Sequence, residues 1–337
     1  MNKILSIIIP TYNMEKYLRK CLDSLIVSDD NMKQLEVLVI NDGSKDSSSL
    51  IAHEYENKFP DSIKVIDKQN GNYGSCINTG LPIASGKYIK VLDADDYFVK
   101  EALESVLVFL GNTDADLIIT PYYMVDEHNS IIKSIKFELP ESIMNCDNKI
   151  IEKTLSSKYF QMHAVMYKKN IFEKLPYHQS EGISYTDQEW MFSPFTKVKT
   201  ITLFNSYLYC YLIGRSGQTV DKKIVAKNVN HHIKGSLKML NEYTKFDIPD
   251  GVIKRYLSHR LNCRISDVFK IFLLNNLSQQ ELVEFDKKIK EIDCSYYNDM
   301  NNITLHNYYP YHFIREWREG KIPSFRFHLY KFIKNTF

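Results

Sequence analysis

The sequence predicts an α/β fold with a mostly parallel central sheet and flanking helices, followed by a C-terminal helical region. Two observations support this prediction. In the first hundred residues, short runs rich in Ile and Val alternate with stretches whose apolar residues recur at helical spacing. Beyond about residue 220, only helical patterns remain. Strands that alternate with helices at this pace indicate βαβ units and therefore a parallel sheet.

Four strands are expected first, and each is a short apolar run that ends in turn or polar residues. They are residues 3–9 (KILSIII), 35–40 (LEVLVI), 62–67 (SIKVID) and 87–92 (KYIKVL). Helical spacing between them predicts helices near residues 17–25 and 50–59. Helices on both faces of a parallel sheet explain why the first strand is apolar almost throughout.

The later elements follow the same reasoning. We expect a helix at 98–111, a strand at 115–125, a helix at 149–157 and strand material at 199–214, which is rich in Thr, Ile and Tyr. Three long helical stretches come after a boundary near Gly214 to Val220. They are residues 227–243, 252–274 and 278–292.

Composition places the chain among ordinary globular proteins. Of its 337 residues 44% are hydrophobic and 25% are charged, and the formal net charge of +2 gives no global indication of nucleic-acid binding. Six scattered cysteines without a CxxC pair indicate reduced thiols in a cytosolic protein. The apolar start is cut short by Pro10, and no segment reaches the roughly 18 apolar residues of a membrane span. We therefore expect a cytoplasmic protein.

Polar residues cluster where the four predicted strands end. The clusters are PTYN at 10–13, NDGS at 41–44, KQNGNYG at 68–74 and DADD at 93–96. Ligands of open parallel sheets bind outside the carboxyl ends of the strands. The four loops are therefore expected to form one ligand-binding rim.

The DADD cluster crowds three carboxylates, Asp93, Asp95 and Asp96, into four positions. Neighbouring carboxylates resist ionising together unless a cation or hydrogen-bond donors lie nearby. A bound divalent metal meets that need. The alternative is an ordinary turn whose aspartates face water.

Two further loops have residues suited to a nucleotide. A carboxylate at Asp42 can accept a hydrogen bond from a base, and the alternative is a well-capped turn between strand and helix. The loop at Asn70 to Gly74 joins a strand to an expected helix. Gly71 and Gly74 permit close approach of the backbone to a ligand, although this loop too could be only a turn. Neither a GxGxxG fingerprint nor a Walker A lysine is present, which weakens dinucleotide-binding and P-loop interpretations.

Four motifs in order carry a family resemblance. SIIIPTYN at 6–13, VINDGSKD at 39–46, NGNYGSCINTG at 70–80 and KYIKVLDADD at 87–96 resemble the successive motifs of family 2 glycosyltransferases with the GT-A fold, which is Rossmann-like. The match is close over the first hundred residues and weaker to about residue 220. It implies an inverting transferase that uses a nucleotide-diphosphate sugar with Mg²⁺ or Mn²⁺.

The resemblance also implies a domain plan and a donor site. Residues 1–217 would form the catalytic domain, with a nucleotide-sugar-binding half at 1–97 and an acceptor half at 98–217, and residues 218–337 would be helical. Asp42 would hydrogen-bond the uracil ring. The residues expected to border the nucleoside are Pro10, Thr11, Tyr12, Asn13 and Glu15, and those expected near the ribose and diphosphate are Asn70, Gly74 and Asn78.

In the same resemblance, Asp93, Ala94 and Asp95 form the DXD motif, with Asp95 as the expected direct metal ligand. The sequence does not separate Asp95 from Asp96 in that role. An inverting transfer also needs a base for the acceptor hydroxyl. YTDQEW at 185–190 resembles the ED motif and places Asp187 at the base.

Thr186 stands where the ED motif usually has Glu, so Glu189 is an alternative base, and an exposed acidic turn is a further alternative. In GRSGQTV at 214–220, which resembles a segment that closes over the diphosphate, Arg215 would offset its charge, with help from Gln218 and Thr219. The alternative is a solvated arginine.

Two aromatic side chains and the tail leave alternatives open. His163 lies where related enzymes approach the acceptor, but a lone histidine between apolar residues is more often a core or interface group than a catalyst. Trp190 could stack on a sugar or pack in the core. Residues 306–337 mix aromatic and basic side chains, which suits peripheral contact with an anionic membrane. A packed helix with a solvated basic face is the alternative.

Together these features predict transfer of a sugar from a UDP-sugar to a glycan or lipid-linked oligosaccharide acceptor in surface polysaccharide synthesis, with no nucleic-acid partner. The oligomeric state is not indicated. Two other classes of protein would share parts of the pattern. A sugar-phosphate nucleotidyltransferase would need a Gly-rich basic loop where this chain has PTYNMEKY, and a noncatalytic sugar-nucleotide or polysaccharide-binding protein would not require Asp187.

Overall fold

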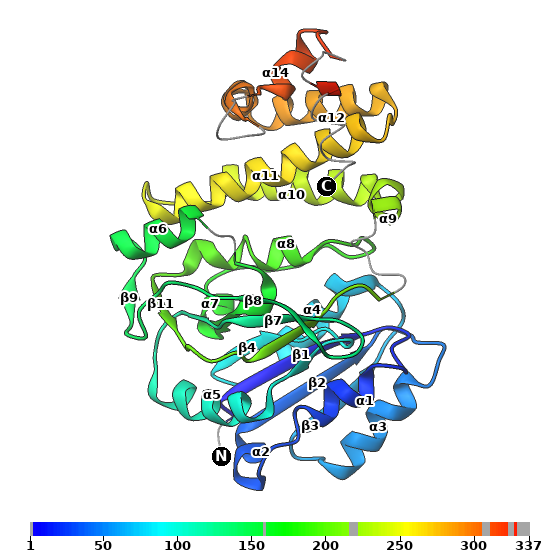
Figure 1. The fold of residues 1–337 in the computed structure, drawn as a ribbon, viewed down its shortest axis with the longest axis vertical. Coiled ribbons are helices and arrows are strands. Elements are labelled where there is room, and N and C mark those ends of the chain that lie inside the picture. The colour runs from blue at the N-terminus through cyan, green and yellow to red at the C-terminus, as the bar shows by residue number, and fades with distance from the viewer. Residues whose placement is uncertain (1–2, 158–159, 216–221, 305–310, 323–326, 329–337) are drawn as a thin grey trace. The chain divides into compact units, whose positions relative to one another are not determined.

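A computed structural model describes residues 3–157, 160–215, 222–304, 311–322 and 327–328. The chain divides into two compact units. The first comprises Met1–Gln218 with Pro249–Lys254, and the second comprises Thr219–Ile248 with Arg255–Phe337. Strands and helices alternate in the first unit and helices make up the second (Figure 1). The predicted α/β class with a helical C-terminal region is confirmed, whereas the functional division of the chain at residue 217 stays a prediction.

The main sheet of the first unit has eight strands in the order β3-β2-β1-β4-β10-β6-β11-β9. Its first half consists of the four predicted strands, and their mutual pairing is parallel as expected. Every residue of β1 and β2 is buried, because helices cover both faces of the sheet. The bounds of these strands are β1 Leu5–Thr11, β2 Leu35–Asn41, β3 Ile63–Asp67 and β4 Tyr88–Val91.

The second half of this sheet is mixed. β10 (Val165–Lys168) runs antiparallel to both β4 and β6 (Leu117–Ile119). β11 (Thr200–Leu203) is parallel to β6, and β9 (Met144–Asn145) closes the edge antiparallel to β11. Because β10 is reversed, the short helix η1 that precedes it (Met162–Ala164) lies at the carboxyl end of β4.

A second sheet has the order β5-β12-β7-β8, and it corrects one prediction. The single strand predicted at 115–125 is two strands in two sheets, β6 and β7, with Pro121 between them. Proline has no N–H to donate, so a continuous ladder is interrupted there. The strand material at 199–214 is likewise divided into β11 and β12. The bounds in this sheet are β5 Tyr97–Phe98, β7 Tyr122–Val125, β8 Ile131–Ile135 and β12 Tyr209–Leu212.

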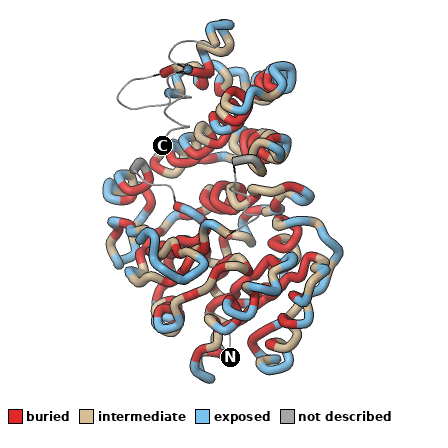
Figure 2. The backbone as a smooth tube through the Cα atoms, turned by 45° about the vertical axis from the view of Figure 1, so that its right-hand side comes forward, coloured by how far each residue is buried: buried red, intermediate tan, exposed pale blue. Residues whose placement is uncertain are grey.

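The predicted helices of the first unit are present. Buried and exposed residues both occur along them, and Figure 2 shows this burial for the described residues. Three short helices escaped prediction, because four to six residues carry little periodic signal. The predicted set is α1 Leu18–Asp23, α3 Ser48–Lys58, α4 Asn72–Ile83, α5 Lys100–Asn112 and α6 Lys149–Ser157, and the unpredicted set is α2 Asp29–Gln34, α7 Asn170–Glu173 and α8 Asp187–Trp190.

The second unit contains the three predicted long helices. Apolar side chains of α11 are buried at helical spacing, at Leu257, Leu261, Ile265 and Phe269 among others. Among the described residues, no helix combines the length and apolar character needed to cross a membrane. Part of the basic tail, including Arg326, Lys331 and Lys334, lies outside the described residues. The bounds are α9 Lys222–Lys227, α10 Val229–Lys245, α11 Val252–Leu274, α12 Gln279–Ile292, α13 Cys294–Asp299 and α14 Phe313–Arg318.

Candidate active site

The loops after β1 and β2 interlock at the predicted rim. The backbone N–H of Asn13 donates to Ser44 Oγ at 3.0 Å, and the N–H of Lys45 donates to Asn13 Oδ1 at 2.7 Å. The Glu15 N–H donates to an Asp46 carboxylate oxygen at 3.0 Å, and the N–H of Ser47 donates back to Glu15 at 3.0 Å. These reciprocal bonds hold the two loops together as one wall.

Of the residues expected to border the nucleoside, Pro10 and Thr11 lie in buried strand β1, and Thr11 is only 1% exposed. The Tyr12 side chain is open to solvent, with 45% of the residue exposed. Asn13 adopts a φ of +54°, which an asparagine tolerates better than most residues. An exposed aromatic ring beside a fixed polar wall is suited to stacking against a base.

Asp42 is 2% exposed and anchors the loop after β3. Its Oδ1 accepts from Lys68 Nζ at 2.6 Å and from the Gly71 N–H at 2.9 Å, and its Oδ2 accepts from the Asn72 N–H at 2.8 Å. The side-chain amide of Asn70 donates to the Asp42 carbonyl at 2.9 Å. The carboxylate therefore shapes the loop. A carboxylate oxygen has two acceptor sites, so Oδ2 still has room for a ring N–H beside its bond to Asn72.

The three clustered aspartates have different partners. Asp93 accepts from the Tyr73 hydroxyl at 2.9 Å. Asp96, 1% exposed, accepts from the Tyr209 hydroxyl at 2.5 Å and from the Leu212 N–H at 2.7 Å. Asp96 is thereby bonded into β12, a role that the sequence did not reveal.

Asp95 instead forms an ion pair with Arg215 Nε, and the two side chains are 11% and 16% exposed. The guanidinium carbon of Arg215 also lies 5.5 Å from the ring centroid of Tyr17. The predicted diphosphate-binding arginine and the predicted metal ligand thus lie together. Gln218 and Thr219, predicted to assist, lie outside the described residues.

Burial and mutual repulsion disfavour the ionised forms of the Asp93 and Asp96 carboxyl groups. Burial raises the pKa of the Asp93 carboxyl to about 7, and the charges of Asp95 and Asp187 add to the rise, while the Tyr73 hydroxyl opposes it. Burial, followed by the charges of Asp95 and Asp93, also raises the pKa of Asp96. Carboxylates in this situation favour a nearby cation.

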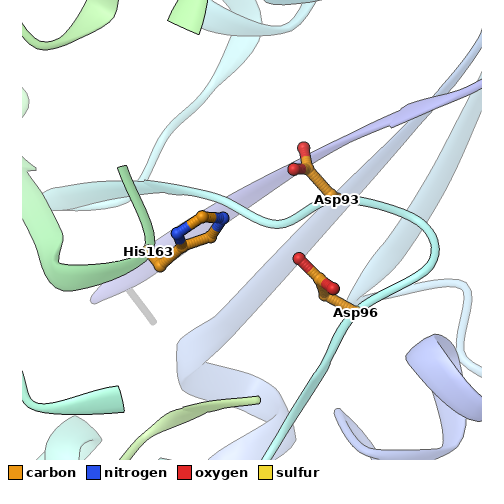
Figure 3. A group of neighbouring side chains, drawn as sticks. All are labelled: Asp93, Asp96 and His163. Atoms are coloured by element: carbon orange, nitrogen blue, oxygen red, sulfur yellow. The ribbon is translucent and has the colours of Figure 1, made fainter. Parts of the chain in front are cut away.

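Residue His163, from η1, joins this cluster. One potential ligand atom from each of Asp93, Asp96 and His163 lies within 4.8 Å of the others, and Figure 3 shows the imidazole facing the two carboxylates. The ring stacks on Tyr211 with a centroid distance of 4.1 Å, and burial and Lys90 lower its pKa to about 3. The carboxylate oxygens of Asp93 and Asp96 are the type of ligand that Mg²⁺ and Mn²⁺ prefer, so these residues fit such an ion. Asp95, which pairs with Arg215, is not part of this group.

Lys90, a fully buried lysine of β4 close to the acidic cluster, was not predicted as a site residue. Its Nζ donates to the carbonyls of Met162, His163 and Val165 at 3.2, 2.6 and 3.1 Å, which ties η1 and the start of β10 to β4. A lysine inside the otherwise apolar strand KYIKVL was the available signal. Buried lysines are rare unless they have partners.

Asp187 is the first residue of α8, where a helix N-terminus favours a negative charge. Gln188 Nε2 donates to Asp187 Oδ2 at 2.8 Å. Burial raises the pKa of both Asp93 and Tyr73, and the charge of Asp187 is one of several that add to each rise. The charge of Asp187 therefore acts on the acidic cluster. Glu189, the alternative base, is 1% exposed.

Of the two alternatives for Trp190, stacking on a sugar or packing in the core, the structure shows core packing. It is 2% exposed, stacks on Phe172 at a centroid distance of 5.0 Å and meets Tyr167 edge-on. Gly74 and Asn78 were predicted to lie near the ribose and diphosphate of the sugar donor, and both lie against the segment that precedes α8. Asn78 Nδ2 donates to the Gln179 carbonyl at 2.9 Å.

The fold and the acidic rim define a mixed α/β protein with its candidate ligand site at the strand ends. Comparison with known proteins supplies the family. The family model described as Glycosyl transferase family 2 matches residues 6–176, just over half of the chain. The chain therefore belongs to glycosyltransferase family 2, which confirms the resemblance noted in the sequence.

Similar proteins come from several organisms. The chain is 39% identical over 128 residues to the uncharacterized glycosyltransferase MG025 of Mycoplasma genitalium, a match of 37% of this chain and 42% of that protein. It is 24% identical over 268 residues to the poly(ribitol-phosphate) beta-N-acetylglucosaminyltransferase TarS of Staphylococcus aureus, across 79% of this chain and 46% of TarS. The matches thus span less than half of either relative.

Solved structures show the same fold. TarS residues 1–349 in complex with UDP-GlcNAc superpose with a TM-score of 0.64 at 21% identity, covering 86% of this chain and 80% of that one. The mannosyltransferase PcManGT from Pyrobaculum calidifontis, in complex with GDP-Man and Mn²⁺, gives a TM-score of 0.50 at 13% identity, over 81% and 74% of the two chains. At these identities the likeness establishes the fold.

Proposed function

We propose that this protein is an inverting glycosyltransferase that moves a sugar from a UDP-sugar to a glycan or lipid-linked oligosaccharide acceptor in surface polysaccharide synthesis. The observation that carries the proposal is the cluster of Asp93, Asp95 and Asp96 directly after β4 in a family 2 chain, with the charge of Asp187 acting on Asp93. The similarity to TarS, a poly(ribitol-phosphate) beta-N-acetylglucosaminyltransferase whose structure was solved with UDP-GlcNAc, supports a UDP-sugar donor and a surface-polymer acceptor.

The donor would lie along the rim. Asp42 Oδ2 would accept the uracil N–H beside its bond to Asn72, and Tyr12 would pack against the base. Residues 1–97 would thus form the nucleotide-sugar half, and residues 98–217 would form the acceptor half. In both halves the protein contributes orientation, since a fixed geometry lowers the entropic part of the barrier.

Asp95 and Asp93 would hold Mg²⁺ or Mn²⁺, with Asp96 bonded into β12 behind them. When bound, the ion supplies positive charge that offsets the diphosphate. Arg215 pairs with Asp95 in the structure and would provide a second positive charge for the departing UDP. We infer that charge compensation at this cluster is shared between the ion and the guanidinium.

Asp187 would accept the proton of the acceptor hydroxyl while that oxygen attacks the anomeric carbon opposite the leaving diphosphate. Asp187 is the first residue of α8, directly after the buried N-cap residue Thr186. The bond from Gln188 orients one carboxylate oxygen. We place the reaction in the cytoplasm, with the basic C-terminal residues in peripheral contact with the inner face of the membrane.

Calorimetry with UDP, with and without Mn²⁺, tests the donor site. Mn²⁺-assisted uptake of UDP by the folded chain, weakened in Asp95→Asn, is the expected result. A following assay of UDP release from a panel of UDP-sugars separates the classes of protein. A nucleotidyltransferase would release no UDP from these donors but would release pyrophosphate from UTP and a sugar 1-phosphate, and a noncatalytic binding protein would bind without releasing UDP; either result would replace the proposal.

A further inference from the structure

The segment from Tyr177 to Thr186 has no helix or strand of its own, and its position depends on side-chain and backbone bonds to other elements. It leads directly into Asp187. Tyr185 within it has a φ of +65°, a backbone conformation that is strained for a bulky residue and persists only where the surroundings hold it. The contacts of this segment therefore determine where Asp187 lies.

Asn78, on α4, provides the first contact. Its Oδ1 accepts from the Gln179 N–H at 2.8 Å, and its Nδ2 donates to the Gln179 carbonyl at 2.9 Å. Nδ2 also lies 2.8 Å from Glu181 Oε1. One side chain thus pairs with both backbone groups of Gln179, in the way that a neighbouring strand would. Asn78 and Gln179 are 101 residues apart in the sequence.

Gln179 in turn bonds to Thr186, the residue before the proposed base. It is fully buried, and its Nε2 donates to Thr186 Oγ1 at 2.9 Å. Its Oε1 accepts from the Tyr177 hydroxyl at 2.8 Å, so both ends of the amide are engaged. Thr186 is 1% exposed and is the N-cap residue of α8. A path of hydrogen bonds therefore runs from α4 through Gln179 to the start of α8.

The backbone joins the same two regions. The Gly182 N–H donates to the Gly71 carbonyl at 2.9 Å, and Gly71 is itself bonded to Asp42. At Gly74 an added Cβ would lie 2.0 Å from the Ser180 carbonyl oxygen, so only glycine allows this approach. The loop expected to meet the donor diphosphate and the segment that carries the proposed base are thus packed directly on each other.

We propose that Asn78, Gln179 and Thr186 are positioning residues that fix Asp187 relative to the donor loop, so that the base is aligned with the donor sugar. The inference rests on the proposed function for the role of Asp187. It also differs from the expectation that Asn78 contacts the ribose or diphosphate, because its amide is engaged by the segment at 179–181. Rigid support of this kind matters, because a displacement of about 1 Å at a catalytic group can lower the rate about 100-fold.

A matched pair at Thr186 tests the proposal in the full-length chain. Thr186→Val keeps the shape but removes the acceptor for Gln179, whereas Thr186→Ser keeps the hydroxyl. We expect kcat in Thr186→Val to fall by about 10- to 100-fold, with KM for the UDP-sugar and the calorimetric Kd for UDP with Mn²⁺ little changed. Thr186→Ser should restore most of kcat. Equal activity in the two variants would overturn the proposal.

Asn78→Leu separates positioning from donor contact. Positioning predicts a lower kcat and an unchanged Kd for UDP with Mn²⁺, while a weaker Kd with normal kcat would refute it and support donor contact. If Asn78→Leu does not fold, the same two quantities are measured in Asn78→Asp, which keeps the acceptor for the Gln179 N–H and removes the donor to the Gln179 carbonyl.

Hydrogen exchange gives a readout that does not depend on activity. Amides of residues 183–190 should exchange faster in Thr186→Val than in Thr186→Ser or the parent, because the start of α8 loses its anchor. If the parent shows no transfer but this difference appears, the proposed function fails while the positioning contact stands. Identical exchange in all three proteins would refute the positioning contact itself.

Discussion

At the residue scale, identical side chains have different roles because their partners differ. Asp95 pairs with Arg215 and stays partly exposed, whereas Asp96 is buried against the Tyr209 hydroxyl and the Leu212 N–H. Because the buried Asp96 carboxylate already accepts two hydrogen bonds, its main role is to stabilise the fold. Asp95 therefore remains the proposed metal ligand of the two that the sequence could not separate.

Replacing Asp187 with Asn tests the proposed base. The amide keeps nearly the same shape but cannot accept the acceptor proton, so we expect transfer to fall by a factor on the order of 10² to 10⁴. UDP binding with Mn²⁺ should be nearly unchanged. Steady-state kinetics and calorimetry on the same preparation measure both quantities. Near-normal turnover would show that another group takes the proton, and Glu189→Gln is then the matched variant to examine.

His53 provides a pH-dependent prediction outside the catalytic cluster. Its Nε2 lies 2.8 Å from Asp67 Oδ2 and its Nδ1 lies 2.7 Å from Glu56 Oε2, and the bonds to Asp67 and then to Glu56 raise its pKa. A raised pKa in the folded state means that this contribution to stability is complete below the unfolded value of about 6.5 and is lost as the pH rises through the folded value.

NMR titration of the ring protons checks this prediction. We expect a pKa above about 6.5 for His53 in the parent chain and a value nearer 6.5 in Asp67→Asn. His53→Gln assigns the resonance among the ten histidines. An unchanged pKa in Asp67→Asn would contradict the assigned cause. The stabilisation is small, since the His53 side chain is 40% exposed.

At the scale of elements, close approach of the backbone positions the strand that ends in the acidic cluster. Gly86 precedes β4, and its N–H donates to Ser6 Oγ at 2.8 Å. An added Cβ would lie 2.5 Å from the Ser6 nitrogen, which is backbone of β1 and cannot move aside alone. The turn before β4 thus requires glycine for space.

Gly86→Ala should lower the free energy of unfolding by about 1–3 kcal/mol, the usual cost of overpacking. Gly111→Ala is the matched control, because its added Cβ would meet Ile4 Cδ1 at an ordinary 3.5 Å. Gly111 lies in α5, where alanine is favoured over glycine by up to about 1 kcal/mol. Urea denaturation measures both changes. Equal effects in the two variants would show that space at Gly86 is not limiting.

At the scale of the whole molecule, the proposed site belongs to the α/β unit. Ligands that bind only the folded state stabilise it by mass action, by about 2.7 kcal/mol at 100 times Kd. We therefore expect UDP with Mn²⁺ to raise the melting temperature of this unit more than either ligand alone. Differential scanning calorimetry of the full chain measures the shift. In Asp95→Asn the effect of Mn²⁺ should be largely lost, and a full shift in that variant would contradict the ligand assignment.

The sequence by itself determined the features that depend on near neighbours. Periodicity located β1 to β4 and the long helices α10, α11 and α12, because apolar spacing within ten or twenty residues decides strand or helix. The ordered motifs identified the family. They also indicated Asp93 and Asp95, while the ED-like segment at 185–190 indicated Asp187, whose charge contributes to the raised pKa of Asp93 after burial and Asp95. The catalytic roles of these residues stay predictions.

Only the tertiary structure decided the contacts between distant segments. Three such contacts give little signal in the local sequence, because each depends on which backbone groups meet across the fold. They are the reversed direction of β10, the bonds of buried Lys90 to three carbonyls, and the pairing of Asn78 with Gln179. The split of 115–125 between two sheets has the same origin. Pro121 signals an interruption, but the second sheet exists only because β5, β8 and β12 supply partners for β7 and for one another.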